Sequence, residues 1–141
     1  MKKLPAYPGC FVCGKHNPIG FHLDFYQNND EIYSEFIPEE IHEGFQGIFH
    51  GGLLTAILDD AMWRIPYILD MVTLTARIEV RFRKPVQTDR KIKVTARLDK
   101  MKGKSVLVKS WVRNEEEEVL AEGTGTFLRA PKEVEEDPAL P

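Results

Sequence analysis

The chain has 141 residues, of which 43% are hydrophobic and 29% are charged, and this length and composition predict one globular domain with its own core. Its formal net charge of -3 lacks the basic excess typical of nucleic-acid-binding proteins, so no nucleic-acid partner is expected. Pro5, Pro8 and Gly9 interrupt the start of the chain where a secretory signal would be apolar, and no other run has the length to span a membrane. We therefore expect a cytoplasmic protein without a membrane partner.

Residues 1–20 are predicted to form a leader loop, because prolines and glycines interrupt every regular period. Cys10 and Cys13 are the only cysteines of the chain, too few for a disulfide framework, so reduced thiols are expected. Together with His16 and His22 the pair could ligate zinc, but the histidines are poorly spaced for it and we predict no metal site. The leader is instead expected to pack against a helix further along the chain.

A hairpin and then a buried helix are predicted next. Residues 21–27 and 31–37 each alternate apolar and polar side chains, as strands do, on either side of a short polar turn. After a glycine-bearing loop at 39–49, apolar side chains recur at i, i+4 spacing over residues 52–65, which predicts a mostly buried helix. Pro66 is expected to end this helix, since proline cannot continue the helical hydrogen bonds.

The second half of the chain contains four long segments of alternating pattern, which predict four strands separated by turns. With no helix available for parallel crossovers, the sheet is expected to be mainly antiparallel. A helix that is apolar nearly all round needs a curved sheet wrapped around it, with the remainder covered by a second subunit. The predicted domain spans residues 21–130, and the acidic, proline-rich residues 131–141 are expected to be a disordered tail.

His50, Gly51 and Gly52 stand where the predicted helix begins. The first turn of a helix has unpaired N–H groups and the positive end of the dipole, so it can bind an oxyanion or a polarised carbonyl. Glycine lets a substrate approach this backbone, as in oxyanion-hole catalysis, although two glycines also suit a tight turn with no chemical role. Considered alone, His50 at the cap position is expected to hold the loop rather than to move protons.

Asp59 is the candidate base or nucleophile within this helix. It shares a helix face with Ala56 and Trp63, so its carboxylate is expected to be partly desolvated. Desolvation raises the pKa of a carboxyl group and makes the ionised form a stronger base. The neighbouring Asp60 points elsewhere and is expected to be solvated.

His50-Gly51-Gly52, six further residues and Asp59 resemble the HGG-x6-[DE] signature of hot-dog-fold acyl-CoA thioesterases, most closely the PaaI-like branch of the phenylacetate pathway. The leader "CFVCGKHNPIGFHLDF" and the strand "TLTARIEVRFRKPV" are also similar to this branch, so the resemblance covers residues 8–129. It implies an α+β hot-dog fold, in which a curved antiparallel sheet of about five to six strands wraps around one long central helix.

The resemblance also implies a homodimer, or a dimer of dimers, that hydrolyses the thioester of a small aromatic or a short- or medium-chain acyl-CoA. The backbone N–H of Gly51 would polarise the thioester carbonyl. Asp59 of the other subunit would attack it or activate a water, which Thr75 would orient. No separate cofactor is implied, because coenzyme A is part of the substrate. Many relatives hold the carbonyl with an Asn or Gln six residues before His50, where this chain has Gly44.

Further residues are expected to bind the substrate. Gly52 leaves room for it at the helix start, and Gln46, in the same loop as Gly44, is the candidate substitute for the missing amide. Trp63 and Met62 would line the acyl site between the subunits. The phosphates of coenzyme A would need cations, for which the candidates are Arg83, Lys84, Lys102 and Lys104.

Two alternatives to hydrolysis stay open. A hot-dog hydratase or dehydratase would use His50 as a catalytic histidine together with Asp59, although the His-Gly-Gly context fits hydrolysis better. A non-catalytic module would bind acyl-CoA without turnover, which agrees with Gly44 in place of the usual amide.

Overall fold

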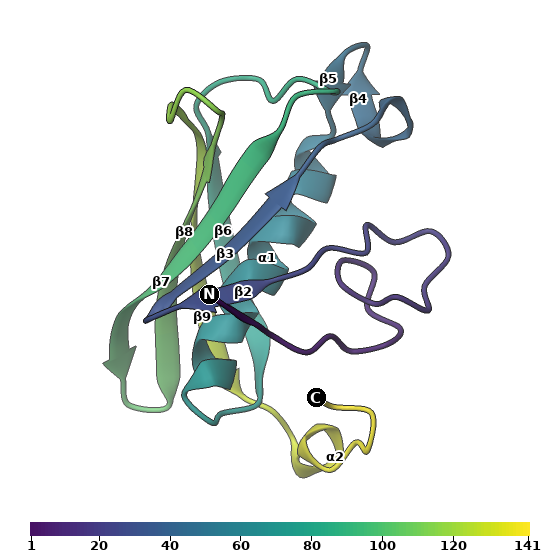
Figure 1. Cartoon of the computed structure of the whole chain (residues 1–141). Helices are drawn as coiled ribbons and strands as arrows, with labels where there is room; N and C mark the ends of the chain where they lie inside the picture. Colours follow the sequence, from purple (N-terminus) through teal and green to yellow (C-terminus); the bar gives the residue numbers. More distant parts are fainter.

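One long helix, α1 (Gly51–Ile68), lies in the curve of a large antiparallel sheet in the computed structural model, which describes residues 1–141 (Figure 1). The sheet contains β1 (Lys2–Lys3), β2 (Tyr26–Asn28), β3 (Glu31–Phe36), β6 (Thr73–Phe82), β7 (Ile92–Lys102), β8 (Ser105–Arg113) and β9 (Val119–Arg129). A small hairpin of β4 (Glu43–Phe45) and β5 (Ile48–Phe49) precedes the helix after a 3-10 turn at Glu40–His42, and α2 (Lys132–Glu135) follows the last strand.

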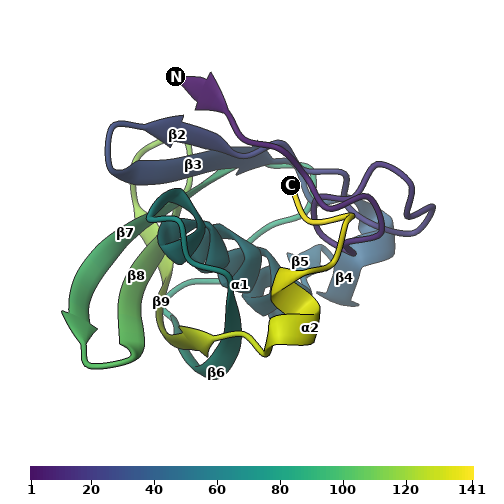
Figure 2. The ribbon, with the colours of Figure 1, turned by 90° about the horizontal axis from the view of Figure 1, so that it is seen from below.

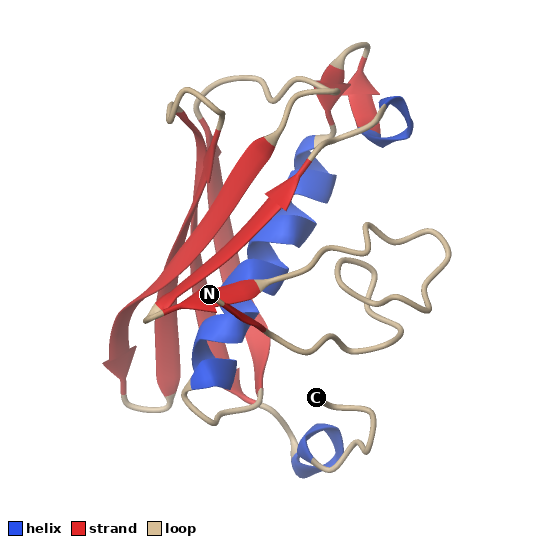
Figure 3. Ribbon diagram, in the orientation of Figure 1, coloured by secondary structure: helices blue, strands red, loops and turns tan.

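The seven strands run in the order β1-β2-β3-β7-β8-β9-β6, and each neighbouring pair is antiparallel. Seen along the sheet, the strands bend around α1 (Figure 2), and the two kinds of element form two layers (Figure 3). The predicted α+β architecture is confirmed. The sheet exceeds the expected five to six strands because the leader contributes the two-residue strand β1 at one edge.

The helix begins where the sequence predicts and continues slightly further. Its apolar stripe is buried against the sheet and comprises Leu54, Ile57, Leu58, Ala61, Met62 and Ile65. The expected end at Pro66 is wrong by two residues, since the helix runs to Ile68. The amides of Leu69 and Met71 both donate to the Pro66 carbonyl at 3.0 Å, so the last turn closes despite the missing proline N–H. No helix of the chain combines the length and apolar character that crossing a membrane requires.

The first predicted strand is much shorter than residues 21–27. Only Tyr26–Asn28 pairs with β3, around a turn in which Asn29 adopts a positive φ of 59°. The preceding residues bond to the leader instead, since the amides of Phe21 and Leu23 donate to the carbonyls of Phe11 and Val12. Alternation of side chains predicts an extended backbone but not which segment will pair with it.

The central strands pack directly on the helix. Val94, Ala96, Val106, Val108 and Phe127 are all buried, and all four strands predicted in the second half are confirmed.

β6 is the outermost strand on the side opposite the leader. It pairs only with β9, so its other edge has no partner within the chain. Leu74 and Phe82, near its two ends, are 47% and 54% exposed. An exposed, ten-residue edge with apolar side chains is a surface on which another strand can pair.

The chain ends differ from each other in how well they follow prediction. The leader is mostly loop, as expected, and it contributes Leu4, Val12 and Cys13 to the core. Residues 131–141, predicted to be disordered, contain α2 and fold back toward the leader, where the Tyr7 hydroxyl donates to Asp137 at 2.8 Å. Val134 and Leu140 are partly buried there, which gives the acidic tail apolar contacts that its overall composition does not suggest.

Candidate active site

The start of α1 leaves one backbone amide without an acceptor. His50 is the N-cap: its Nδ1 accepts from the amides of Gly52 at 2.9 Å and Leu53 at 3.4 Å. Its carbonyl accepts from Leu54 at 3.0 Å. The amide of Gly51 donates to no atom of the chain. The first turn therefore offers the N–H of Gly51, at the positive end of the helix dipole, to an external acceptor.

Gly52 is required by this cap. A Cβ atom at position 52 would lie 2.9 Å from Cε1 of the His50 ring, closer than real Cβ atoms approach. Because Nδ1 of His50 accepts, the neutral ring carries its proton on Nε2. The histidine thus organises the backbone of the turn, which agrees with its expected loop-holding role.

The loop before the helix places Gly44 beside the cap. A Cβ atom on Gly44 would lie 3.4 Å from Cα and 3.5 Å from Cδ2 of His50, in ordinary contact. A side chain at position 44 would therefore lie against the histidine. Gln46 is at the exposed tip of the β4–β5 hairpin and makes no hydrogen bond to the helix start. The structure does not bring it into the position of the missing amide.

Asp59 and Thr75 form a hydrogen-bonded pair. The Thr75 hydroxyl on β6 donates to Oδ1 of Asp59 at 2.6 Å, next to an irregularity in the pairing of β6 with β9 between Thr75 and Arg77. Burial raises the pKa of the Asp59 carboxyl, and the hydrogen bond from Thr75 opposes that rise. The predicted desolvation of Asp59 is confirmed.

A pocket of about 260 Å³ opens beside this pair. Trp63 lines it, and its indole N–H donates to the Thr73 carbonyl at 2.7 Å while its ring stacks on Tyr67. The predicted role of Met62 in lining the acyl site is wrong for this chain. Met62 is fully buried against the sheet, and its Cε would lie 3.2 Å from a Cβ on Gly125. Helical spacing places Met62 on the stripe that packs against the sheet, not on the pocket side.

Asp60, expected to be solvated, is mostly buried. Its side chain is 15% exposed, and its Oδ2 lies 3.6 Å from the guanidinium of Arg64, which is 2% exposed. Burial raises the pKa of Asp60 to about 6, although the positive charge of Arg64 lowers it.

The two cysteines of the leader lie next to this aspartate, and Sγ of Cys10 is 3.9 Å from Oδ1 of Asp60. A hydrogen bond between the two thiols lowers the pKa of Cys10 to about 5 and raises that of Cys13. Sequence reasoning missed Arg64, for which an arginine amid apolar helix residues was the available signal.

The four predicted phosphate-binding cations do not gather in one place. Arg83 pairs with Glu122 at 2.9 Å, and Lys84 pairs with Glu118. Lys102 and Lys104 flank the β7–β8 turn, which is at the same end of the sheet as the Thr73 end of β6, whereas Arg83 follows the Phe82 end of β6. The ten residues of β6 separate these ends by about 30 Å. Spacing along strands cannot show which end of the sheet a turn occupies.

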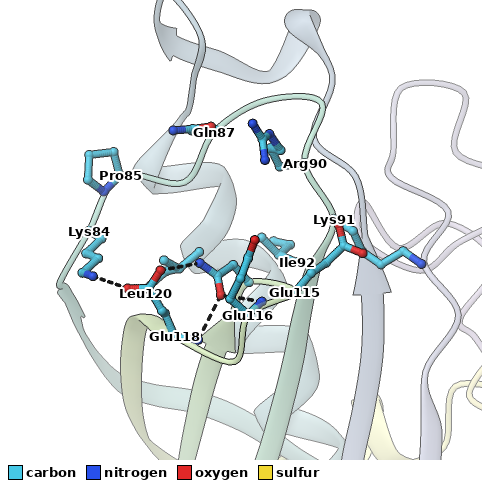
Figure 4. A pocket seen from close by; sticks show the side chains of 11 residues that line it. Lys84, Pro85, Gln87, Arg90, Lys91, Ile92, Glu115, Glu116, Glu118 and Leu120 are labelled. Carbon is cyan, nitrogen blue, oxygen red and sulfur yellow. Dashed lines mark hydrogen bonds and ion pairs between the residues drawn. The ribbon is translucent and has the colours of Figure 1, made fainter.

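Lys84 lines a second, polar pocket of about 450 Å³ (Figure 4). Arg90 and Lys91 also line it, opposite the acidic turn at Glu115 and Glu116. This pocket contains neither the Gly51 amide nor Asp59, so it is separate from the candidate chemistry. Sequence reasoning did not single out Arg90, which makes no ion pair within the chain.

The curved antiparallel sheet around a single central helix defines the hot-dog class of folds. The sequence profile described as "Thioesterase superfamily" matches residues 46–121, which is more than half of the chain. The chain belongs to the thioesterase superfamily.

A curated relative and several solved structures resemble the chain. Acyl-coenzyme A thioesterase THEM4 of Bos taurus is 27% identical over 126 residues, which cover 87% of this chain and 52% of that protein. The chain thus spans about half the length of this relative.

Three solved structures share the fold. A thioesterase superfamily protein has a TM-score of 0.79 at 19% identity, covering 83% of this chain and 61% of its own. PaaI of E. coli, from the phenylacetic acid degradation operon, has a TM-score of 0.73 at 13% identity, with 79% and 81% covered. The smu.793 protein of Streptococcus mutans, bound to acetyl CoA, has a TM-score of 0.72 at 14% identity, with 78% and 90% covered.

Proposed function

We propose that the protein is an acyl-CoA thioesterase. One observation carries this proposal: the same helix holds a first-turn amide without an acceptor, at Gly51, and a partly desolvated carboxylate, at Asp59. A thioester carbonyl becomes an oxyanion when it is attacked, so hydrolysis needs a fixed N–H donor on one side and a base or nucleophile on the other. Membership of the thioesterase superfamily supports the same reaction.

The two groups must come from different subunits to act on one carbonyl. Gly51 and Asp59 are eight residues apart on α1, which is about 12 Å along the helix axis. The free edge of β6 supports a homodimer in which two copies of this strand pair antiparallel. Such pairing would bring the Thr75 end of one β6, with its Asp59, next to the Phe82 end of the other. Phe82 contacts Gly51, since its ring lies 3.4 Å from a Cβ position there. Further assembly into a dimer of dimers stays a prediction.

The proposed chemistry assigns one task to each group. The Gly51 amide donates to the carbonyl oxygen and stabilises the negative charge that develops on it. Asp59 either takes a proton from a water that attacks the carbonyl carbon or attacks that carbon itself, and Thr75 holds the carboxylate or the water. The carbon–sulfur bond then breaks and coenzyme A leaves as a thiolate, which needs no strong acid to assist it. When water is the nucleophile, the acyl group leaves directly as a carboxylic acid. When Asp59 attacks, the acyl group stays on it as an anhydride, which a water molecule then hydrolyses to the acid and the free aspartate. Neither route requires an added cofactor.

The cap geometry favours hydrolysis over the hydratase or dehydratase alternative. Nδ1 of His50 is engaged by two backbone amides, so the ring is fixed in the helix cap rather than available as a base at that atom. A non-catalytic acyl-CoA binding module remains the second candidate. Gly44 favours it, because the position that contacts His50 carries no side chain to hold the carbonyl.

The proposal also includes the class of acyl-CoA that the protein hydrolyses. The structural relatives include a protein bound to acetyl CoA and one from a phenylacetic acid degradation operon. They support a small aromatic or a short- or medium-chain acyl-CoA as the substrate. In this proposal Trp63, which lines the pocket beside Asp59, contacts the acyl group, and Arg83 and Lys84 contact the phosphates. The cytoplasmic location expected from the sequence stays a prediction.

Thiol release from a panel of aromatic, short-chain and medium-chain acyl-CoAs tests the proposal. The wild type should hydrolyse at least one of them, and Asp59→Asn should reduce kcat by about 100- to 10,000-fold, the usual contribution of a general base. Asp70→Asn is the matched control, because Asp70 is exposed, lies beyond the helix and has a positive φ of 63° that asparagine also adopts. Binding without hydrolysis in the wild type would support the binding module, and full activity of Asp59→Asn would refute the proposed role of Asp59.

A further inference from the structure

Three potential metal ligands meet where the leader crosses the central helix. Cys10 and Cys13 come from the leader and Asp60 from α1, fifty residues away from Cys10 along the chain. One ligand atom from each lies within 4.8 Å of the other two. None of the three takes part in the proposed hydrolysis, although they line the same pocket as Asp59.

The turn around the two cysteines presents both sulfurs to the helix. The amide of Cys13 donates to Sγ of Cys10 at 3.5 Å, and the amide of Gly14 donates to the Cys10 carbonyl at 2.9 Å. A Cβ at Gly14 would lie 2.3 Å from the Pro8 carbonyl oxygen, so this tight turn requires glycine. Two cysteines separated by two residues are a recurrent pair of zinc ligands.

Asp60 supplies the third ligand, and one of its carboxylate oxygens has no hydrogen-bond partner. Its Oδ2 is buried and accepts no hydrogen bond, although it faces the Arg64 guanidinium at 3.6 Å. A buried carboxylate oxygen without a hydrogen-bond donor is costly unless a cation binds it. Arg64 is held in place by a bond from its Nη1 to the Pro5 carbonyl at 2.9 Å and by the Phe25 ring below it.

The charges of the cluster match a divalent ion. Two thiolates and one carboxylate carry three negative charges, and the buried Arg64 carries one positive charge. A divalent cation makes this sum zero, which removes the cost of an unbalanced charge in the interior. Sulfur ligands favour zinc over calcium or magnesium, which prefer oxygen ligands.

We propose that Cys10, Cys13 and Asp60 bind one zinc ion, which fastens the leader to α1. The three side chains leave one position of a four-coordinate ion for water. Binding displaces into solvent any proton that a ligand thiol still carries, because the thiolate is the metal ligand. The site does not depend on thioesterase activity, and its tests measure the metal directly.

The experiment uses the full chain, reduced under exclusion of oxygen, incubated with excess Zn²⁺ and freed of unbound metal by gel filtration. The wild type should retain one zinc per chain by elemental analysis. With Co²⁺ instead, it should show a thiolate-to-cobalt charge-transfer band and the visible bands of tetrahedral cobalt. Cys13→Ser and Asp60→Asn should weaken zinc binding by more than about 100-fold, since loss of a ligand exceeds the cost of losing a supporting contact.

His16→Ala is the matched control. His16 is exposed and three residues beyond Cys13, so it is the ligand that spacing alone would suggest, yet it lies outside the cluster. This variant should retain full zinc binding. Loss of zinc from His16→Ala comparable to the loss from Cys13→Ser would overturn the proposed ligand set, and so would full binding by Asp60→Asn.

A measurement on the wild type avoids any doubt about folding of the variants. Zn²⁺ should slow the reaction of both thiols with an aromatic disulfide reagent by at least about tenfold, because a bound thiolate is less available for exchange. Wild-type protein that holds no zinc, with both thiols reacting equally fast in the presence and absence of Zn²⁺, overturns the proposal. Ready formation of a Cys10–Cys13 disulfide even in the presence of Zn²⁺ would also overturn it, in favour of a redox pair.

Discussion

The two halves of α1 are organised in different ways. At the start of the helix, His50 and Gly52 satisfy the first turn from within three residues, so that the free Gly51 amide results from local sequence. In the middle of the helix, the two aspartates contact distant segments. Asp59 accepts a hydrogen bond from Thr75 on β6, and Asp60 lies beside the cysteines of the leader. Two adjacent aspartates thereby enter different environments. A local motif fixes a backbone group, whereas the properties of a side chain depend on which segments fold against it.

Apart from the loss of Asp59 itself, the largest expected effect comes from removing the free amide at the helix start. Gly51→Pro deletes this N–H and keeps the helix, because proline is favoured at the first helical position and His50 already has the extended backbone (φ -60°, ψ 126°) that a following proline requires. Loss of one oxyanion-hole donor should lower kcat by about 100- to 1,000-fold.

Gly51→Ala is the comparison for this variant. It retains the N–H and adds a Cβ that lies 3.4 Å from the Phe82 ring. Steady-state thiol release, with circular dichroism to verify the helix, measures both variants. Equal loss of activity in Gly51→Pro and Gly51→Ala would mean that Gly51 is needed to leave room for the substrate and not to donate its N–H.

A smaller effect is expected in the middle of the helix. Thr75→Val removes the hydroxyl that donates to Asp59 at 2.6 Å while preserving the shape of the side chain. A hydrogen bond to a charged group contributes about 1.5–3 kcal/mol, so kcat/KM should fall by about 10- to 100-fold. Thr75→Ser restores the hydroxyl and should recover most of the activity. Wild-type rates in Thr75→Val would show that the pair has no part in turnover.

The cap should contribute to stability more than to chemistry. His50→Ala leaves the amides of Gly52 and Leu53 without their acceptor, which should lower the free energy of unfolding by about 1 kcal/mol. His50→Asn, which keeps a capping oxygen, should restore both stability and hydrolysis. Urea unfolding and thiol release, measured on the same samples, separate the two roles. A stable but inactive His50→Asn would instead favour proton transfer by His50, as in a hydratase.

The smallest effect is expected from restoring the amide that relatives carry before the helix. Gly44→Asn places a side chain in ordinary contact with His50, without a clash at its Cβ. One added neutral hydrogen bond to the carbonyl should raise kcat/KM by roughly 2- to 10-fold. Gly44→Leu is the control without a donor. Activity that appears only with Asn at position 44 would identify the wild type as a binding module.

The contrast between local motifs and contacts with distant segments also explains which features could be predicted from the sequence. The helix start, its cap and the four long strands follow from local patterns, and so does the face that carries Asp59. The pairing of residues 21–25 with the leader and the burial of Asp60 depend on contacts between distant segments, which side-chain periodicity does not reveal. Met62 shows an intermediate case: the pattern correctly assigns it to the buried stripe, which is why it cannot also line the pocket.

The strand order has a consequence for how the chain is made. β6 is complete at residue 82, yet its partner in the sheet, β9, begins at Val119, and β7 and β8 lie between them in sequence. During synthesis from the N-terminus, β6 and one side of α1 therefore stay uncovered until the last strand has emerged from the ribosome. β9 closes the sheet by inserting between β8 and β6, so a chain that stops before residue 119 would leave two further strand edges unpaired, one on β8 and one on β6. The final strand thus determines when the nascent protein is protected from aggregation.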